Sequence, residues 1–482
     1  GTEAAVTDVG ETAYGMKDVM TDADGKIYMY LPAGETSILL GMYYYTGTVS
    51  AEAGADNRLT RGKCRYDLQV VGDPAYYDRD EDSHIIQIKD GAKLTIKSAD
   101  GYGKDNYSQT RIQIEANASV SLTLDGVYID TAKAYGGAPL LIAENSTGNV
   151  NIILKGENVL IAADNYAGIQ KNGDAENIGT LTISGDGSLT AKGGEYGAGI
   201  GGGDGGAASN ITISGGTVTA TGGEHGSGIG GGDRGAASNI TITGGIVIAT
   251  AISEVEQTAT GAGIGGGYSR EGNNITISGG TVTATSIAAG DDGVTGAGIG
   301  GGMYGNGSNI TISGGTVTAS SIATGKDGIT GAGIGGGFCG KGSNITISGG
   351  TVTASSIATG KDGITGAGIG GGAGVDGSNI TISGGTVTAL STADEEANEG
   401  YGIGSGCYGG ESTVTVTGGN IKAGRLYAVE GKDGDDTYEA YPARADLLLL
   451  AGKNLALGNP VLQTYNKKTG ETKTLSYNLK DV

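Results

Sequence analysis

Residues 261–267 read Gly-Ala-Gly-Ile-Gly-Gly-Gly, and residues 274–284 read Asn-Ile-Thr-Ile-Ser-Gly-Gly-Thr-Val-Thr-Ala. This pair of segments recurs along the chain. Successive isoleucines of the glycine motif are 29, 35, 35, 35, 35 and 34 residues apart. A repeat of this length is typical of a solenoid, in which each turn buries its apolar face against its neighbours. The isoleucines of the motif are Ile200, Ile229, Ile264, Ile299, Ile334, Ile369 and Ile403.

Each repeat contains two segments with the period of a half-buried strand. Apolar and polar residues alternate over 210–214 and again over 217–221, and Gly215-Gly216 between them permits a bend. The glycine motif alternates as well, and no segment shows the apolar spacing of a helix. The sequence therefore predicts an all-β chain that forms a right-handed parallel β-helix with three strands per turn.

The alternation also predicts which side chains form the core. We expect Ile200, Ile211, Ile213 and Val218 to point inward and to stack on their equivalents in the next turns. The extra residues of the 35-residue turns follow the third strand, and we expect them to form a loop that protrudes from one edge. The outward side of the first strand is glycine. Either a flat object or another protein layer approaches this bare backbone or, as we favour, a neighbouring loop lies on it.

Three regions are expected along the chain. Residues 1–65 predict a small β-sandwich-like module, residues 66–440 the β-helix, and residues 441–482 a β extension. The last six residues, Tyr-Asn-Leu-Lys-Asp-Val, resemble Tyr-Gly-Met-Lys-Asp-Val at 14–19. We therefore expect the extension to lead into another copy of the N-terminal module, and the chain to be a monomeric piece of a larger tandem-repeat protein.

Composition narrows the classes of partner. The chain carries 52 acidic and 30 basic residues, a formal charge of −22, which disfavours nucleic acid and anionic membranes as partners. No stretch is apolar enough over a sufficient length to insert into a membrane. Zinc is disfavoured because the chain has only His84, His225 and three separated cysteines. No cofactor is predicted, although the acidic surface leaves calcium possible.

The repeats resemble those of secreted or wall-associated β-helical proteins of clostridia-related, often gut, Gram-positive bacteria. They are also similar to the carbohydrate-binding domains of the pectin-lyase-like fold. The resemblance rests on the alternation of Gly-Ala-Gly-Ile-Gly-Gly-Gly with Ser-Asn-Ile-Thr-Ile-Ser-Gly-Gly-Thr-Val-Thr-Ala and covers about residues 66–440. It implies an extracellular location and binding of polysaccharide, sometimes with calcium. No ligand-binding residue of that family matches a position in this chain.

Candidate ligand-binding residues lie where the repeat varies. Directly after the glycine motif, successive turns carry Asp, Asp, Tyr, Met, Phe, Ala and Cys. We expect an exposed apolar and aromatic strip across neighbouring turns, formed by Tyr268, Met303, Tyr304 and Phe338. Sugars stack on such rings through their C–H faces, so this strip is the candidate binding site.

Catalytic signals are weaker. Glu224-His225-Gly226 is the only fragment that resembles a polygalacturonase-like Gly-His-Gly motif. Asp204 and Asp233 occupy equivalent positions in adjacent turns, at about 5 Å, the separation of a retaining glycosidase pair, but a role in the turn is favoured. We therefore predict a non-catalytic, secreted or wall-associated surface protein, an adhesin or binder of a polysaccharide or of another host or bacterial glycan. The alternatives are a polysaccharide lyase or glycoside hydrolase, and a structural stalk.

Overall fold

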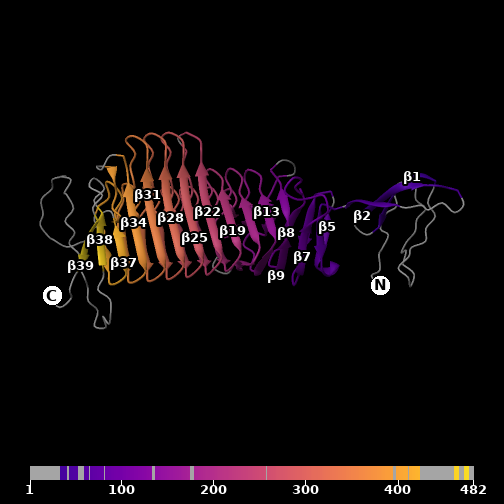
Figure 1. Ribbon diagram of the computed structural model, residues 1–482, viewed down its shortest axis with the longest axis horizontal. Coiled ribbons are helices and arrows are strands. Elements are labelled where there is room, and N and C mark those ends of the chain that lie inside the picture. The colour runs from indigo at the N-terminus through magenta and orange to yellow at the C-terminus, as the bar shows by residue number, and fades with distance from the viewer. Residues whose placement is uncertain are drawn as a thin grey trace.

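The computed structural model describes residues 33–40, 43–52, 59–64, 66–80, 82–132, 136–173, 178–256, 258–394, 398–410, 412–423, 461–465 and 472–476. Within these ranges the chain is built from strands, with one short 3-10 helix, η1 (Pro74–Tyr76). Most of the strands belong to three 12-stranded sheets that run the length of the β-helix (Figure 1). Each full turn contributes one strand to each sheet, which confirms the predicted parallel β-helix with three strands per turn.

The strands of the glycine motif form the first sheet. Its members are β5 (Tyr77–Asp80), β6 (Ile85–Ile88), β8 (Arg111–Ile114), β11 (Leu140–Ile142), β14 (Ile169–Lys171), β17 (Ile200–Gly201), β20 (Ile229–Gly230), β23 (Ile264–Gly265), β26 (Ile299–Gly300), β29 (Ile334–Gly335), β32 (Ile369–Gly370) and β35 (Ile403–Gly404).

The second sheet collects the Ile-Thr-Ile strands. Its members are β4 (Leu68–Val71), β7 (Lys93–Ser98), β9 (Val120–Asp125), β12 (Val150–Lys155), β15 (Leu181–Gly185), β18 (Ala208–Ile213), β21 (Ala237–Ile242), β24 (Gly272–Ile277), β27 (Gly307–Ile312), β30 (Gly342–Ile347), β33 (Gly377–Ile382) and β36 (Val414–Val416).

The third sheet collects the Thr-Val-Thr strands and two strands near the C-terminus. Its members are β10 (Tyr128–Asp130), β13 (Glu157–Ile161), β16 (Ser188–Lys192), β19 (Thr217–Gly222), β22 (Ile246–Ser253), β25 (Thr281–Ala288), β28 (Thr316–Ala323), β31 (Thr351–Ala358), β34 (Thr386–Thr392), β37 (Asn420–Ala423), β38 (Val461–Tyr465) and β39 (Thr472–Ser476).

The core is the predicted ladder of aliphatic side chains. Ile200 pairs in register with Ile229, which pairs with Ile264, and the pattern continues through the repeats. Ile200 is fully buried, as are Ile211, Ile213 and Val218. Because identical turns stack in register, each buried side chain meets its own equivalent above and below, and the period-two pattern is sufficient to build the core.

The glycine-rich face of the first strand is covered rather than bare. A Cβ atom on Gly298 would lie 2.5 Å from the backbone nitrogen of Ser320 in β28 of the same turn. The same atom would lie 2.6 Å from the carbonyl oxygen of Gly333 in the next turn. The third strand, and not a neighbouring loop as we favoured, therefore packs directly on the glycines. Only glycine fits at this distance between backbones.

The longer turns differ from the shorter ones at one edge. β19 has six residues, whereas β25 has eight, so part of the extra sequence extends the third sheet instead of forming a loop. The remaining residues form edge loops that pair with one another, as in the parallel bridges from Ala259 to Val294 and from Val294 to Ile329. Figure 1 shows that the loops above β25, β28 and β31 stand taller than those above β13 and β19.

The two ends of the helix depart from the repeat. At the N-terminal end β4 pairs with β7, and β5 with β6, in antiparallel orientation. At the other end β38 extends the third sheet in parallel beside β37, and β39 pairs with it antiparallel. β1 (Gly34–Leu40), β2 (Tyr43–Val49) and β3 (Thr60–Cys64) form one antiparallel sheet within the region predicted as a β-sandwich-like module. The related segments 14–19 and 477–482 lie outside the described residues.

Candidate functional site

The residue after each glycine motif is bonded to the preceding turn. Its backbone N–H donates to the carbonyl oxygen of the residue that stands just before the motif of that turn. The two positions therefore meet at one corner of the helix along the repeats, although the sequence separates them. The bonds are Asp233 to Tyr196 (2.7 Å), Tyr268 to His225 (2.9 Å), Met303 to Thr260 (3.3 Å), Phe338 to Thr295 (3.3 Å), Ala373 to Thr330 (3.3 Å) and Cys407 to Thr365 (2.9 Å).

The predicted strip of four residues is divided in the structure. Met303 is buried, which corrects the expectation that it is exposed, whereas Tyr304 is 50% exposed. The difference arises because Tyr304 has a positive φ of 58°, which turns the chain outward after Met303. The Tyr304 ring lies against Phe338 of the next turn, with 5.5 Å between centroids. Tyr268 lies in a separate cluster.

That second cluster contains rings from three consecutive turns. Tyr196 and His225 stack with 5.7 Å between centroids and 19° between planes. The Tyr268 ring lies 5.3 Å from the His225 ring, tilted by 57°. We call Tyr196, His225 and Tyr268 the ring stack. All three side chains are partly exposed, so the stack presents ring surface to solvent. The sequence indicates His225 as part of a weak Gly-His-Gly-like motif and as one of two histidines, and it does not indicate Tyr196.

The first long turn holds His225 in place. His225 Nδ1 lies 3.0 Å from the carbonyl oxygen of Ala259. A carbonyl oxygen only accepts, so Nδ1 carries the proton, and in the neutral ring Nε2 is an acceptor. The orientation of this ring is therefore set by a residue just beyond β22, where the taller edge of the helix begins.

The ring stack lies at this point because the turn length changes here. In the long turns the position before the glycine motif is a buried threonine, and Thr295 Oγ1 lies 2.5 Å from Ser321 Oγ in the lengthened third strand. In the shorter turns the third strand ends sooner, as β19 does at Gly222, and the same position carries Tyr196 or His225. The step from 29 to 35 residues in the repeat length is the sequence signal that marks this position.

Asp204 and Asp233 share one guanidinium group beside the ring stack. Arg234 Nε donates to Asp233 Oδ2 at 2.9 Å, and an Arg234 amino nitrogen lies 3.8 Å from Asp204 Oδ1. Asp233 is buried, whereas Asp204 is exposed. The two carboxylates thus form a charge network at the corner, in keeping with the favoured role in the turn.

Further carboxylates lie near the Tyr196 ring. The Glu195 carboxylate beside the Tyr196 hydroxyl raises the pKa of Tyr196, and the charges of Glu224 and Asp233 act in the same direction. The ring stack therefore combines ring faces with several hydrogen-bond acceptors. This combination can hold a small polar ligand that has an apolar face.

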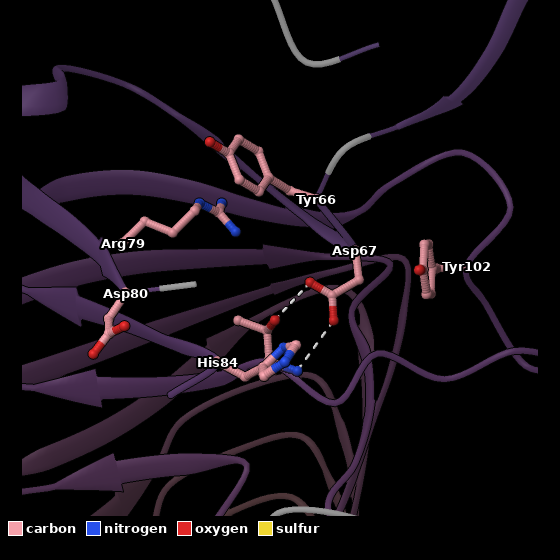
Figure 2. Close-up of a pocket in the computed structure, with 7 residues that line it drawn as sticks. Tyr66, Asp67, Arg79, Asp80, His84 and Tyr102 are labelled. Carbon is pink, nitrogen blue, oxygen red and sulfur yellow. Dashed lines mark hydrogen bonds between the residues drawn. The ribbon is translucent and has the colours of Figure 1, made fainter. Parts of the chain in front are cut away.

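A cavity of about 200 Å³ lies at the N-terminal end of the helix (Figure 2). It is formed by residues that precede the clear repeats, and no motif in the sequence pointed to it. The residues that line it are Tyr66, Asp67, Arg79, Asp80, His84, Tyr102 and Thr110.

The polar groups of this cavity mainly tie the first strands together. Asp67 accepts hydrogen bonds from the Ser108 and Thr110 hydroxyls, both at 2.6 Å, and from the Gln109 and Thr110 backbone nitrogens. Burial acts to raise the pKa of Asp67, but these hydrogen bonds outweigh it and the pKa is lowered. Arg79 lies 4.0 Å from the Tyr66 ring centroid and donates to the Leu68 carbonyl oxygen at 2.8 Å. The arrangement closes the end of the β-helix.

The structure also bears on the cysteines, on metal ions and on membranes. Cys339 and Cys407 are not joined in a disulfide. Across the described ranges no group of three or more His, Cys, Asp or Glu side chains is placed to hold a metal ion, and calcium binding stays an untested prediction. No helix in the part of the chain that the structure describes is long and apolar enough to cross a membrane.

Comparison with known proteins supports the architecture. A family model described as a beta helix repeat matches residues 181–204, 211–233, 240–268, 275–303, 310–338, 345–373 and 380–407. No curated protein and no solved structure matches the chain significantly. Each match runs from the second strand of one turn to the residue after the next glycine motif, and therefore ends at the corner described above. Over these turns the chain is similar to the beta helix repeat, and the structure there is a parallel β-helix.

Proposed function

We propose that this protein is an extracellular, cell-surface β-helix that binds a polysaccharide or another glycan and serves in adhesion without cleaving its ligand. The ring stack carries the proposal. Tyr196, His225 and Tyr268 present ring surface from three consecutive turns, with carboxylates beside them. Sugar rings stack their C–H faces on aromatic side chains, and their hydroxyls donate to carboxylates.

A second aromatic contact supports binding of a polymer. Tyr304 and Phe338 form a pair on the same corner, farther along the helix axis. Both clusters include residues that follow the glycine motif, a corner that recurs once per turn about 4.8 Å apart. A ligand with its own repeat along a chain can contact both clusters, whereas a single sugar can contact only one.

Two observations favour binding over catalysis. A hydrolase that uses paired carboxylates needs one of them to donate a proton to the leaving group. Asp204 and Asp233 are instead both engaged in ion pairs with the Arg234 guanidinium. The other polar cluster, around Asp67, is engaged in hydrogen bonds within the chain. The formal charge of −22 accords with a soluble surface protein outside the cell.

The test is a glycan array that covers plant, mucin and bacterial polysaccharides. We expect binding to a restricted set, weakened about tenfold or more by Tyr196→Ala or Tyr268→Ala and less by Tyr304→Ala. Tyr408→Ala is the matched control, because Tyr408 is 72% exposed after the last glycine motif but lies outside both aromatic clusters. An array with no selective binding to any glycan, or an equal loss of binding in Tyr408→Ala, would contradict the proposal.

A product assay addresses the enzymatic alternative. The ligands found on the array are incubated with the protein and assayed for new reducing ends and for unsaturated products. We expect neither. If either product is released and Asp233→Asn abolishes its release, the function of this corner is catalysis and not binding alone.

A further inference from the structure

The surface around the ring stack is negatively charged, and this charge restricts the kinds of ligand that can bind there. Glu195 and Glu224 add their carboxylates to those of Asp204 and Asp233. The nearby cation, Arg234, is engaged by both aspartates. Arg270 is exposed, and its Nε donates to the Arg234 carbonyl oxygen at 2.9 Å. The four carboxylates thus outnumber the two guanidinium groups at this corner.

The same groups suit one kind of ligand. A ring face attracts a cation through its quadrupole, and a carboxylate accepts the N–H groups of an ammonium ion. A uronic acid or a sulfated sugar would place its own negative charge against Glu195 and Glu224 and would be repelled. A sugar with a protonated amino group satisfies both the rings and the carboxylates.

We propose, building on the function proposed above, that the ring stack selects glycans that bear free amino groups, such as polymers of hexosamine that lack the N-acetyl group. The sugar ring packs on Tyr196 and His225, and its ammonium group is held by Glu195 and Glu224. When the His225 ring is neutral, the Nδ1–H that is bonded to Ala259 leaves a lone pair on Nε2 that can accept from a sugar hydroxyl.

The arrangement also accounts for the place of the site on the helix. In the long turns the equivalent corner is occupied by Met303 and Phe338, and the position before the motif is a buried threonine. No carboxylate occupies either position there. Acidic groups and open ring faces coincide at the short turns, where the edge is low.

The experiment compares three oligosaccharides of equal length on the full chain by calorimetry. These are β-1,4-linked glucosamine, the same oligomer with N-acetyl groups, and galacturonate. We expect the glucosamine oligomer to bind about tenfold more tightly than the N-acetylated one, and galacturonate not to bind. The preference should shrink as salt is raised, because exposed charges are screened.

Charge variants separate this inference from the proposed function. Glu195→Gln with Glu224→Gln should weaken binding of the glucosamine oligomer about tenfold and leave that of the N-acetylated oligomer unchanged. Asp362→Asn, a charge removed from a distant exposed loop, is the control and should change neither. Equal affinity for the amino and N-acetyl oligomers would overturn the amine preference and leave glycan binding intact. Absence of binding to all three, together with a flat glycan array, would overturn both.

Discussion

The short turn that contains β17 to β19 and the long turn that contains β26 to β28 share their interior and differ at one edge. Ile200 and Ile299 are both fully buried in the same ladder. The position before the glycine motif is Tyr196 in the first turn and Thr295 in the second. The tyrosine is partly exposed and the threonine is completely buried.

The difference shows how a solenoid separates folding from recognition. The core depends on the alternation within the strands, which is the same in both turns. The edge depends on loop length, and six extra residues convert an open corner into a buried column of paired hydroxyls. Because neighbouring turns stack regardless of edge length, the edge is free to vary without loss of the fold.

The largest expected effect tests whether the two interiors are equivalent. Ile200→Ala and Ile299→Ala should each lower the free energy of unfolding by about 3 kcal/mol, because each leaves a cavity in a fully buried ladder. Urea unfolding followed by circular dichroism measures both. A loss in one turn more than twice that in the other would break the comparison.

A buried lysine makes the interior near the short turns different. Lys171 is 3% exposed, and its Nζ donates to the Ser209 carbonyl oxygen at 2.6 Å. Burial lowers the pKa of Lys171 from 10.5 to about 8. Lys171→Met should therefore stabilise the fold by up to about 3 kcal/mol below pH 8.

The pH dependence of this effect has a definite sign. Between pH 8 and 10.5 the unfolded chain binds the lysine proton and the folded chain releases it, so the stability of the native protein rises with pH in this window. The advantage of Lys171→Met should shrink over the same window. Urea midpoints of both proteins at several pH values measure the difference, and a constant difference would contradict the account.

Glycine packing should matter equally in short and long turns. Gly298→Ala would place a Cβ 2.5 Å from the Ser320 backbone nitrogen, and Gly199→Ala would place one 2.6 Å from that of Thr221. Each should lower the free energy of unfolding by about 2 kcal/mol, because backbone atoms must move. Gly103→Ala is the control, since nothing lies within 4 Å of its added Cβ. If the melting temperatures of Gly298→Ala and Gly199→Ala fall no more than that of Gly103→Ala, the third strand does not pack closely on these glycines.

The smallest effects concern the edge itself. Thr295→Val should cost about 1 kcal/mol, because it leaves Ser321 Oγ without the hydroxyl 2.5 Å away and removes the acceptor of the Gly331 N–H. Tyr196→Thr, at the equivalent short-turn position, should change stability less and weaken glycan binding more. The melting temperature and the glycan affinity of both variants, measured in parallel, distinguish the long-turn position from the short-turn position. If Tyr196→Thr costs more stability and less binding than Thr295→Val, the short-turn corner is structural.

Much of the fold was accessible to reasoning on sequence. The constant spacing of Ile264, Ile299 and Ile334 determined the register, and period-two alternation identified the inward residues. Of the candidate strip, Met303 was misplaced because alternation does not extend through a corner, where a positive φ at the next residue redirects the chain. The cavity around Asp67 lies before the clear repeats and left no periodic signal.

Sequence alone determined the solenoid, because identical turns leave one register in which every isoleucine of the ladder is buried. It also indicated where the repeat varies. Tertiary structure decided that Tyr196, His225 and Tyr268 meet. The first strand of each clear repeat is only two residues long, and the residue after the glycine motif bonds to the residue before the glycine motif of the preceding turn. No linear pattern encodes that contact, because it arises only when one turn is stacked on the next.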